Sequence, residues 1–178
     1  LDASDRKVLG STMPTWYGGW NNTVSYKNFD LNVFFRFSGG NKIMNASRQS
    51  ALFNMDFSNN GTEILGRWIS PEQPGDGMTP KIGYGDASSL FNDGYTDSHF
   101  VESGNYLKLS TLALGYTLPK AVVSKLNMTK IRFYVQGQNL LTITGYSGLD
   151  PETNSRLGVD WNGLPQQRSF TFGANITF

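Results

Sequence analysis

The fold is decided by the last ten residues, Ser169-Phe170-Thr171-Phe172-Gly173-Ala174-Asn175-Ile176-Thr177-Phe178. The even positions carry Phe, Phe, Ala, Ile and Phe, whereas the odd positions carry Ser, Thr, Gly, Asn and Thr. Because successive side chains of a strand point to opposite faces, this segment has one apolar face and one polar face. A strand of about ten residues is long for a soluble domain but suits a tilted crossing of a bilayer. Soluble sandwiches also alternate, so this stretch leaves a membrane barrel and a sandwich both open.

A hairpin near the N-terminus shows the same alternation. Its predicted strands, residues 16–26 and 29–37, flank the two-residue turn Lys27-Asn28, in which Asn tolerates positive φ. This turn pairs Tyr26 with Phe29, Val24 with Leu31, and Trp20 with Phe35, so the two apolar faces coincide. The aromatic residues at the two ends of the first strand are separated by roughly 25 Å of height once the strand is tilted, which matches the apolar band of an outer-membrane barrel.

Two further long strands are predicted at residues 107–118 and 131–141. The first of them changes phase, because Leu107 and Leu109 occupy odd positions whereas Leu112 and the leucines after it occupy even ones. A β-bulge at Ser110 or Thr111, with one unpaired residue, would absorb this shift.

The connections between the predicted strands alternate between short and long. Residues 27–28 and 119–129 are short connections, the second with room for one helical turn, whereas residues 41–105 and 145–168 are long and rich in Gly, Asn, Ser, Asp and Pro. A short helix is predicted over Thr62–Trp68, capped by Asn60 or Thr62. Short turns on one side and long loops on the other are typical of a bacterial transmembrane barrel. Five strands cannot close a barrel, which needs about eight, so residues 1–178 are predicted to be the C-terminal part of a larger one.

The shared phase of these strands predicts which side chains face lipid and which face the lumen. The lumen is expected to receive Arg36, Arg132, Gln136 and Thr171. Lipid is expected to contact Trp16, Trp20, Val24, Leu31, Val33, Phe35, Phe133, Val135, Phe170, Phe172 and Ile176.

Composition excludes several classes of protein. The net charge of +1 gives no reason to expect nucleic acid as a partner. No window approaches eighteen consecutive apolar residues, which excludes a transmembrane helix but not alternating strands. Cysteine is absent, so disulfide scaffolds and thiolate metal sites are excluded. The N-terminal residues lack the apolar stretch of a signal peptide, so an export signal is expected upstream.

Fragments spread over nearly the whole chain resemble the SusC/RagA group of TonB-dependent outer-membrane transporters, and they occur in the same order. They are Asp5–Gly10, Tyr17–Gly19, Tyr26–Leu31, Gly40–Ile43, Arg67-Trp68, Phe100–Gly104, Tyr106–Leu109, Leu114–Pro119, Gly137–Leu141, Asp150–Glu152, Pro165 and Arg168–Gly173. After Arg67-Trp68 the chain reads Ile-Ser-Pro-Glu-Gln-Pro, where the group usually has Thr-Pro-Glu-Asn-Pro.

The resemblance implies a barrel of about 22 strands filled by an N-terminal plug that is not in this chain. It also implies a SusD-like surface lipoprotein as partner, energy from the TonB complex, and a substrate that is an oligosaccharide or a peptide. The remaining partners would be the rest of the same barrel and the outer-membrane lipid. Two other interpretations stay open: a TonB-dependent receptor for an iron chelate or a vitamin, and a soluble adhesive or structural β-domain.

Two sets of residues are candidates for functional sites. Trp68, Tyr95, Tyr146 and Trp161 lie in the long connections and could stack on sugar rings, although packing of the loops explains them equally well. Phe178, with Phe170 and Phe172, looks like the signal that is read when outer-membrane barrels are inserted; the alternative is an ordinary aromatic girdle.

Catalytic and metal sites have little support. His99 is the only histidine, and its neighbours Ser98 and Asp97 cannot form a catalytic triad with it along one segment, so a solvated loop histidine is expected. Asp93 and Asp97 could help to hold calcium, but the EF-hand spacing is absent. The sequence therefore predicts a protein that is not an enzyme and has no cofactor, except for this weak calcium candidate.

Overall fold

The computed structural model describes residues 4, 6–49, 59–81, 98–152 and 157–178. The chain divides into two compact units. The first, called the loop unit below, comprises Leu1–Met13, Asn41–Gly104 and Tyr146–Pro165; the second, called the sheet unit, comprises Pro14–Gly40, Asn105–Gly145 and Gln166–Phe178.

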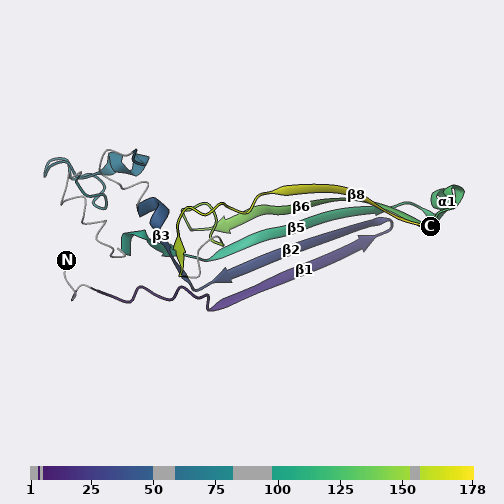
Figure 1. The fold of residues 1–178 in the computed structure, drawn as a ribbon, viewed down its shortest axis with the longest axis horizontal. Coiled ribbons are helices and arrows are strands. Elements are labelled where there is room, and N and C mark those ends of the chain that lie inside the picture. Colours follow the sequence, from purple (N-terminus) through teal and green to yellow (C-terminus); the bar gives the residue numbers. More distant parts are fainter. Residues whose placement is uncertain (1–3, 5, 50–58, 82–97, 153–156) are drawn as a thin grey trace. The chain divides into compact units, whose positions relative to one another are not determined.

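The sheet unit is one antiparallel sheet of five strands. The strands are β1 (Trp16–Tyr26), β2 (Phe29–Gly39), β5 (Tyr106–Thr117), β6 (Lys130–Thr144) and β8 (Ser169–Thr177). They lie in the order β1-β2-β5-β6-β8, so each long strand pairs with the next long strand along the chain (Figure 1). All five strands predicted from alternation are confirmed, with ends that differ by a few residues.

The hairpin between β1 and β2 has the predicted register. Tyr26 lies opposite Phe29 and Trp20 opposite Phe35, whose rings stack with centroids 5.7 Å apart. The expectation that the asparagine adopts positive φ is wrong, because Lys27 adopts it instead, with φ of 53°. Positive φ at the first central residue alone is the φ pattern of a type II′ turn, a common two-residue hairpin connection.

The predicted bulge in β5 is at Ser110. Phe34 pairs with Thr111 and Phe35 pairs with Leu109, which leaves Ser110 without an opposite residue on β2. The register with β6 also shifts between Leu109 and Thr111. The bulge therefore returns the leucines before and after it to the same face of the sheet.

One kind of residue predominates on each face of the sheet, with exceptions such as Asn22 on the apolar face and Phe34 on the polar face. One cross-strand row on the apolar face is Val24, Leu31, Leu114, Val135 and Phe172. One row on the polar face is Thr23, Asn32, Ala113, Gln136 and Thr171.

The register confirms how the predicted residues divide between the faces. Val33 pairs with Leu112, whereas Arg36, three residues later, pairs with Lys108 on the opposite face. The apolar face is open: Trp20 is 57% exposed and Phe172 is 79% exposed. A soluble sandwich would cover this face with a second layer, so the described residues do not form one.

The short connection after β5 contains the predicted helical turn. It consists of α1 (Lys120–Val123) and the 3₁₀ helix η6 (Ser124–Leu126), and it lies at the same end of the sheet as the chain's C-terminus (Figure 1). Among the described residues, no helix has the length and apolar character needed to span a membrane.

The loop unit has a small sheet of its own in the order β4-β3-β7. Its strands are β3 (Lys42–Asn45), β4 (Val101–Ser103) and β7 (Val159–Asp160), and the 3₁₀ helix η5 (Ser98–Phe100) leads into β4. Ile43, Ala46, Phe100 and Tyr146 form its buried apolar core.

The helix predicted over 62–68 is confirmed as the shorter 3₁₀ helix η3 (Thr62–Gly66). The predicted cap is wrong, because Gly61 occupies the N-cap position and no side chain caps the helix. Three-residue turns leave fewer orphan amide groups to satisfy than an α-helix does, so a side-chain cap is less necessary here.

Candidate functional site

A network of polar side chains joins three segments of the loop unit that are far apart in sequence. Asn45, buried at the end of β3, donates from Nδ2 to Glu102 Oε1 at 3.2 Å. The hydroxyl of Ser147 donates to the same oxygen at 2.6 Å, and its backbone N–H donates to Glu102 Oε2 at 2.7 Å. Both carboxylate oxygens of Glu102 are therefore occupied by donors from the other segments, which ties those segments together.

Arg48 extends this network toward η3 and η5. Its Nη2 donates to Glu63 Oε2 at 2.7 Å, and its Nη1 donates to the carbonyl oxygen of His99 at 3.4 Å. The hydrogen bonds with Glu63 raise the pKa of Arg48, and the charge of Glu102 acts in the same direction. The guanidinium therefore stays charged and holds η3 near η5 across a wide pH range.

Tyr146 is a structural residue of the same unit. Only 5% of the residue is exposed, and its hydroxyl donates to Asp160 Oδ2 at 2.6 Å. The other oxygen of Asp160 accepts the backbone N–H of Asn162 at 2.9 Å. Burial, followed by this hydrogen bond, raises the pKa of Tyr146, so the phenol remains a donor at physiological pH.

The segment 66–79 is a compact loop closed by its own hydrogen bonds. Trp68 N–H donates to the carbonyl of Thr79 at 2.9 Å, and Asp76 N–H donates to the carbonyl of Gly66 at 2.8 Å. Asp76 Oδ1 accepts the backbone N–H groups of Met78 and Thr79 at 2.8 and 2.7 Å. The N–H of Thr79, then that of Met78, and then the Thr79 hydroxyl lower the pKa of Asp76, so the carboxylate is ionised at neutral pH.

Gly75 is required at its position in this loop. Its φ is +69°, and a Cβ there would lie 2.2 Å from the carbonyl oxygen of Gly66. Backbone atoms cannot move away as the end of a side chain can, so only glycine fits.

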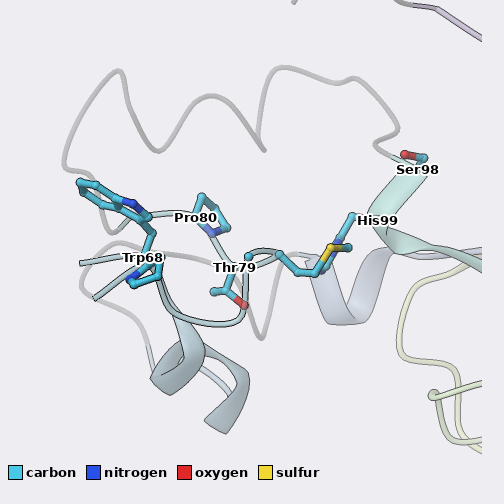
Figure 2. Close-up of a pocket in the computed structure, with 8 residues that line it drawn as sticks. Trp68, Thr79, Pro80, Ser98 and His99 are labelled. Atoms are coloured by element: carbon cyan, nitrogen blue, oxygen red, sulfur yellow. The ribbon is translucent and has the colours of Figure 1, made fainter. Parts of the chain in front are cut away.

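This loop forms one wall of a cavity of about 520 Å³. The lining residues are Trp68, Pro74, Gly77, Met78, Thr79, Pro80, Ser98 and His99. Trp68 and Pro80 lie at one end, His99 and Ser98 at the other, and Thr79 between them (Figure 2). The volume is in the range of small-molecule sites, about 300–1,000 Å³.

The four predicted binding aromatics have different surroundings. Trp68 is 36% exposed and lines the cavity, with Lys81 Nζ 5.8 Å from its ring centroid. Trp161 is 71% exposed. The burial of Tyr146 gives its ring a packing role and leaves no accessible face for a sugar, whereas Tyr95 lies outside the described residues. Ligand stacking by Trp68, Tyr95 and Trp161 stays a prediction.

His99 was expected to be a solvated loop residue, and it does lie in the long connection 41–105, but it is only partly solvated. The residue is half-buried in η5, its Nε2 lies 3.5 Å from Arg48 Nη2, and its ring packs edge-on against Phe100. The family-like fragment Phe100–Gly104 begins directly after His99. It indicated a structured segment at this point, and a residue next to such a segment is held in place.

The polar face of the sheet unit contains an ion pair that passes over a glycine. Arg132 on β6 donates from Nε to Asp30 Oδ1 on β2 at 2.9 Å, although β5 lies between these strands. Gly115 on β5 leaves space for this contact, because a Cβ there would lie 2.3 Å from Arg132 Nη2 and 2.5 Å from Asp30 Oδ1. Arg36 on the same face donates from Nε to Ser110 Oγ at 3.0 Å, which anchors the bulge.

The predicted insertion residues lie on and after β8. Phe170 and Phe172 are exposed on the apolar face, and Phe178 follows the strand and is 85% exposed. Their role in insertion stays a prediction.

Among the described residues, no three His, Asp or Glu side chains gather in a way that could hold a metal ion. The calcium candidates Asp93 and Asp97 lie outside those residues.

An antiparallel meander with an uncovered apolar face and a polar, ion-paired opposite face has the form of a segment of transmembrane β-barrel. Comparison with known proteins agrees with this class. The chain is 32% identical over its whole length to TonB-dependent receptor P3 of Formosa agariphila, of which it covers 18%. It is 25% identical over its whole length to TonB-dependent receptor SusC of Bacteroides thetaiotaomicron, of which it covers 16%.

Solved structures give the same result. The chain superposes on the RagAB peptide transporter with a TM-score of 0.85 and 26% identity, covering 100% of this chain and 19% of that one. The 'open-open' state of the RagAB peptide importer gives a TM-score of 0.81 and 27% identity, with 97% and 18% covered. No protein-family model matches the chain.

The chain therefore belongs to the SusC/RagA-type TonB-dependent receptors, which are outer-membrane β-barrel proteins, and its large sheet is a segment of such a barrel. It spans about a fifth of the length of the relatives that it matches.

Proposed function

We propose that this chain is the C-terminal barrel segment of a transporter that imports oligosaccharides or peptides across the outer membrane. The observation that supports this most directly is the full-length likeness to SusC and to the RagAB peptide transporter, combined with the exposed apolar face of the sheet. The segment is not an enzyme in this proposal, and it contributes a wall of the barrel and part of the surface that meets substrate.

The orientation of the segment follows from its two kinds of connection. The 27–28 turn and the 119–129 connection lie on the periplasmic side, and the long segments 41–105 and 145–168 lie outside the cell. The apolar face contacts lipid and the face with Asp30 and Arg132 lines the lumen. Exposed Trp161 and cavity-lining Trp68 are the described aromatic residues available for substrate.

The import proposal includes two partners and an energy source. A SusD-like lipoprotein would meet the outer loops, as the two-component name RagAB suggests for that importer. The TonB complex would supply energy through a part of the protein that precedes this segment.

Import can be tested in a strain that lacks the full-length gene. Growth on oligosaccharides or peptides as the limiting nutrient should be lost and restored by the gene, and a protonophore should abolish uptake. Co-purification of a surface lipoprotein with the tagged full-length protein would support the partner. If growth on these nutrients is normal and growth on an iron chelate or a vitamin is lost, the protein is instead a receptor of that other kind.

Phe178, with Phe170 and Phe172, would act as the insertion signal in the same proposal. Deleting Phe178 from the full-length protein should sharply reduce the surface-exposed barrel while refolding in detergent micelles stays near normal. Equal surface levels for the deletion and the parent would leave Phe178 as an ordinary girdle aromatic.

A further inference from the structure

We infer that the cavity beside segment 66–79 is a subsite for a neutral sugar ring, with Trp68 as its stacking platform and the side chains of Ser98 and His99 as its polar end. This inference rests on the proposed import function for its biological setting, but binding at the cavity does not require transport. It adds His99 and Ser98 to the residues that meet substrate, and it chooses saccharide over peptide.

The cavity has the mixed surface that a sugar ring needs. A pyranose has apolar C–H faces and a rim of hydroxyl groups, so it is bound by an aromatic ring against one face and by polar atoms around the edge. Trp68 and Pro80 lie at one end of the cavity, and Ser98 and His99 lie at the other (Figure 2). None of the eight lining residues is Asp, Glu, Lys or Arg, which favours a neutral ligand; the cation nearest the stacking platform is Lys81, whose Nζ lies 5.8 Å from the ring centroid of Trp68.

The backbone of the wall argues against a peptide. Peptides that bind as an added strand depend on free main-chain donors and acceptors in the receptor. In this wall the N–H groups of Trp68, Met78 and Thr79 already donate to Thr79 O or to Asp76 Oδ1, and the two prolines have no N–H. At these five residues recognition rests on side chains and ring faces, which favours a sugar over an added peptide strand.

The subsite is preorganised. Segment 66–79 is closed by the Trp68–Thr79 and Asp76–Gly66 backbone hydrogen bonds, and Gly75 packs closely against the Gly66 carbonyl. On the opposite wall, Arg48 donates to the carbonyl of His99 while it is held by Glu63. A ligand then loses little free energy to ordering of the protein, which raises affinity.

The test uses the full-length protein purified in detergent without its partner lipoprotein. It is applied to an array of neutral oligosaccharides, uronic-acid and sulfated oligosaccharides, and peptides blocked at both ends, and the tightest neutral oligosaccharide is then titrated. The protein should bind neutral oligosaccharides. Trp68→Ala should weaken this binding about tenfold, and Trp68→Phe should retain most of it.

Two more variants complete the test. Met78→Arg keeps the backbone bond to Asp76 and places a long cation in the cavity, so it should weaken neutral binding at least as much as Trp68→Ala. Leu164→Ala is the control, since Leu164 is exposed in the loop unit and does not line the cavity. The inference is overturned if both cavity variants keep wild-type affinity, if only charged sugars or peptides bind, or if no array member binds. If the variants weaken binding as expected but the full-length protein supports no import, the proposed function is refuted and the subsite inference is retained.

Discussion

The sheet unit and the loop unit are stabilised in different ways. The sheet unit exposes most of its large apolar side chains, as with Phe172 at 79%, and its internal contacts are the backbone ladder, cross-strand ring contacts such as Trp20 with Phe35, and a few polar contacts. The loop unit buries Ile43, Phe100 and Tyr146 around a network of hydrogen-bonded polar side chains. The sheet therefore depends for its stability on surroundings outside this chain, whereas the loop unit carries its own core.

The largest expected effect comes from a charge on the apolar face. Val33→Arg in the full-length protein should lower the free energy of unfolding from liposomes by about 2–4 kcal/mol, because a guanidinium would enter hydrocarbon. Gln136→Arg, on the polar face, is the matched control and should cost far less. Equal losses in urea titrations of the two variants would show that the faces do not have lipid and water as their surroundings.

The next effect concerns the ion pair over Gly115. Gly115→Ala places a Cβ between Asp30 and Arg132, so the pair must separate, at a cost of about 1–2 kcal/mol. The cost should largely vanish in a background that already contains Asp30→Asn and Arg132→Gln, as measured by a double-mutant cycle of unfolding free energies. An undiminished cost in that background would mean that the clash is with the backbone and not with the pair.

A comparable but local effect is expected in the loop unit. Tyr146→Phe removes the donor to buried Asp160 and should destabilise this unit by about 1–2 kcal/mol. Hydrogen exchange should accelerate at the amides of β7 and β3 and stay unchanged in β5 and β6. Acceleration of the whole chain together would contradict the separate stability of the two units.

The smallest effect is a pH dependence of segment 66–79. The pKa of Asp76 is lowered in the folded loop, so its stabilisation is present above the unfolded value of about 3.9 and is lost as pH falls through the lower folded value. Hydrogen exchange at the Trp68 and Thr79 amides, corrected for the intrinsic rate, should keep its protection above about pH 4 and lose it progressively below, because a carboxylate held by amide donors protonates only at lower pH. Asp76→Asn should remove this pH dependence, and a dependence that persists in the variant would belong to another group.

The sheet unit was largely predictable from sequence, because alternation with a period of two records which face each side chain takes. The leucine phase shift also predicted a bulge at Ser110 or Thr111, and the structure has it at Ser110. The ion pair between Asp30 and Arg132 was not predictable, since it depends on two strands that are not neighbours and on the missing side chain of Gly115.

The loop unit was much less predictable. Its strands β3, β4 and β7 have two to four residues each, which is too short for a period to show. Its contacts join Asn45 with Ser147 and Arg48 with Glu63 through single side chains. Such contacts leave no repeating pattern in the sequence from which they could be predicted. The burial of Tyr146 and the place of His99 in a cavity wall follow from those contacts, so sequence spacing alone could not reveal them.

The most direct test of the central claim is a cysteine scan of β2 across residues 31–36 with a spin label. The sequence contains no cysteine, so single substitutions in this segment can be placed one at a time in the full-length protein, after removal of any cysteine elsewhere. In liposomes, labels at 31, 33 and 35 should be relaxed by oxygen dissolved in the lipid, and labels at 32, 34 and 36 by a water-soluble nickel chelate. Accessibility without this alternation, or with its sign reversed, would contradict the assignment of the apolar face to lipid.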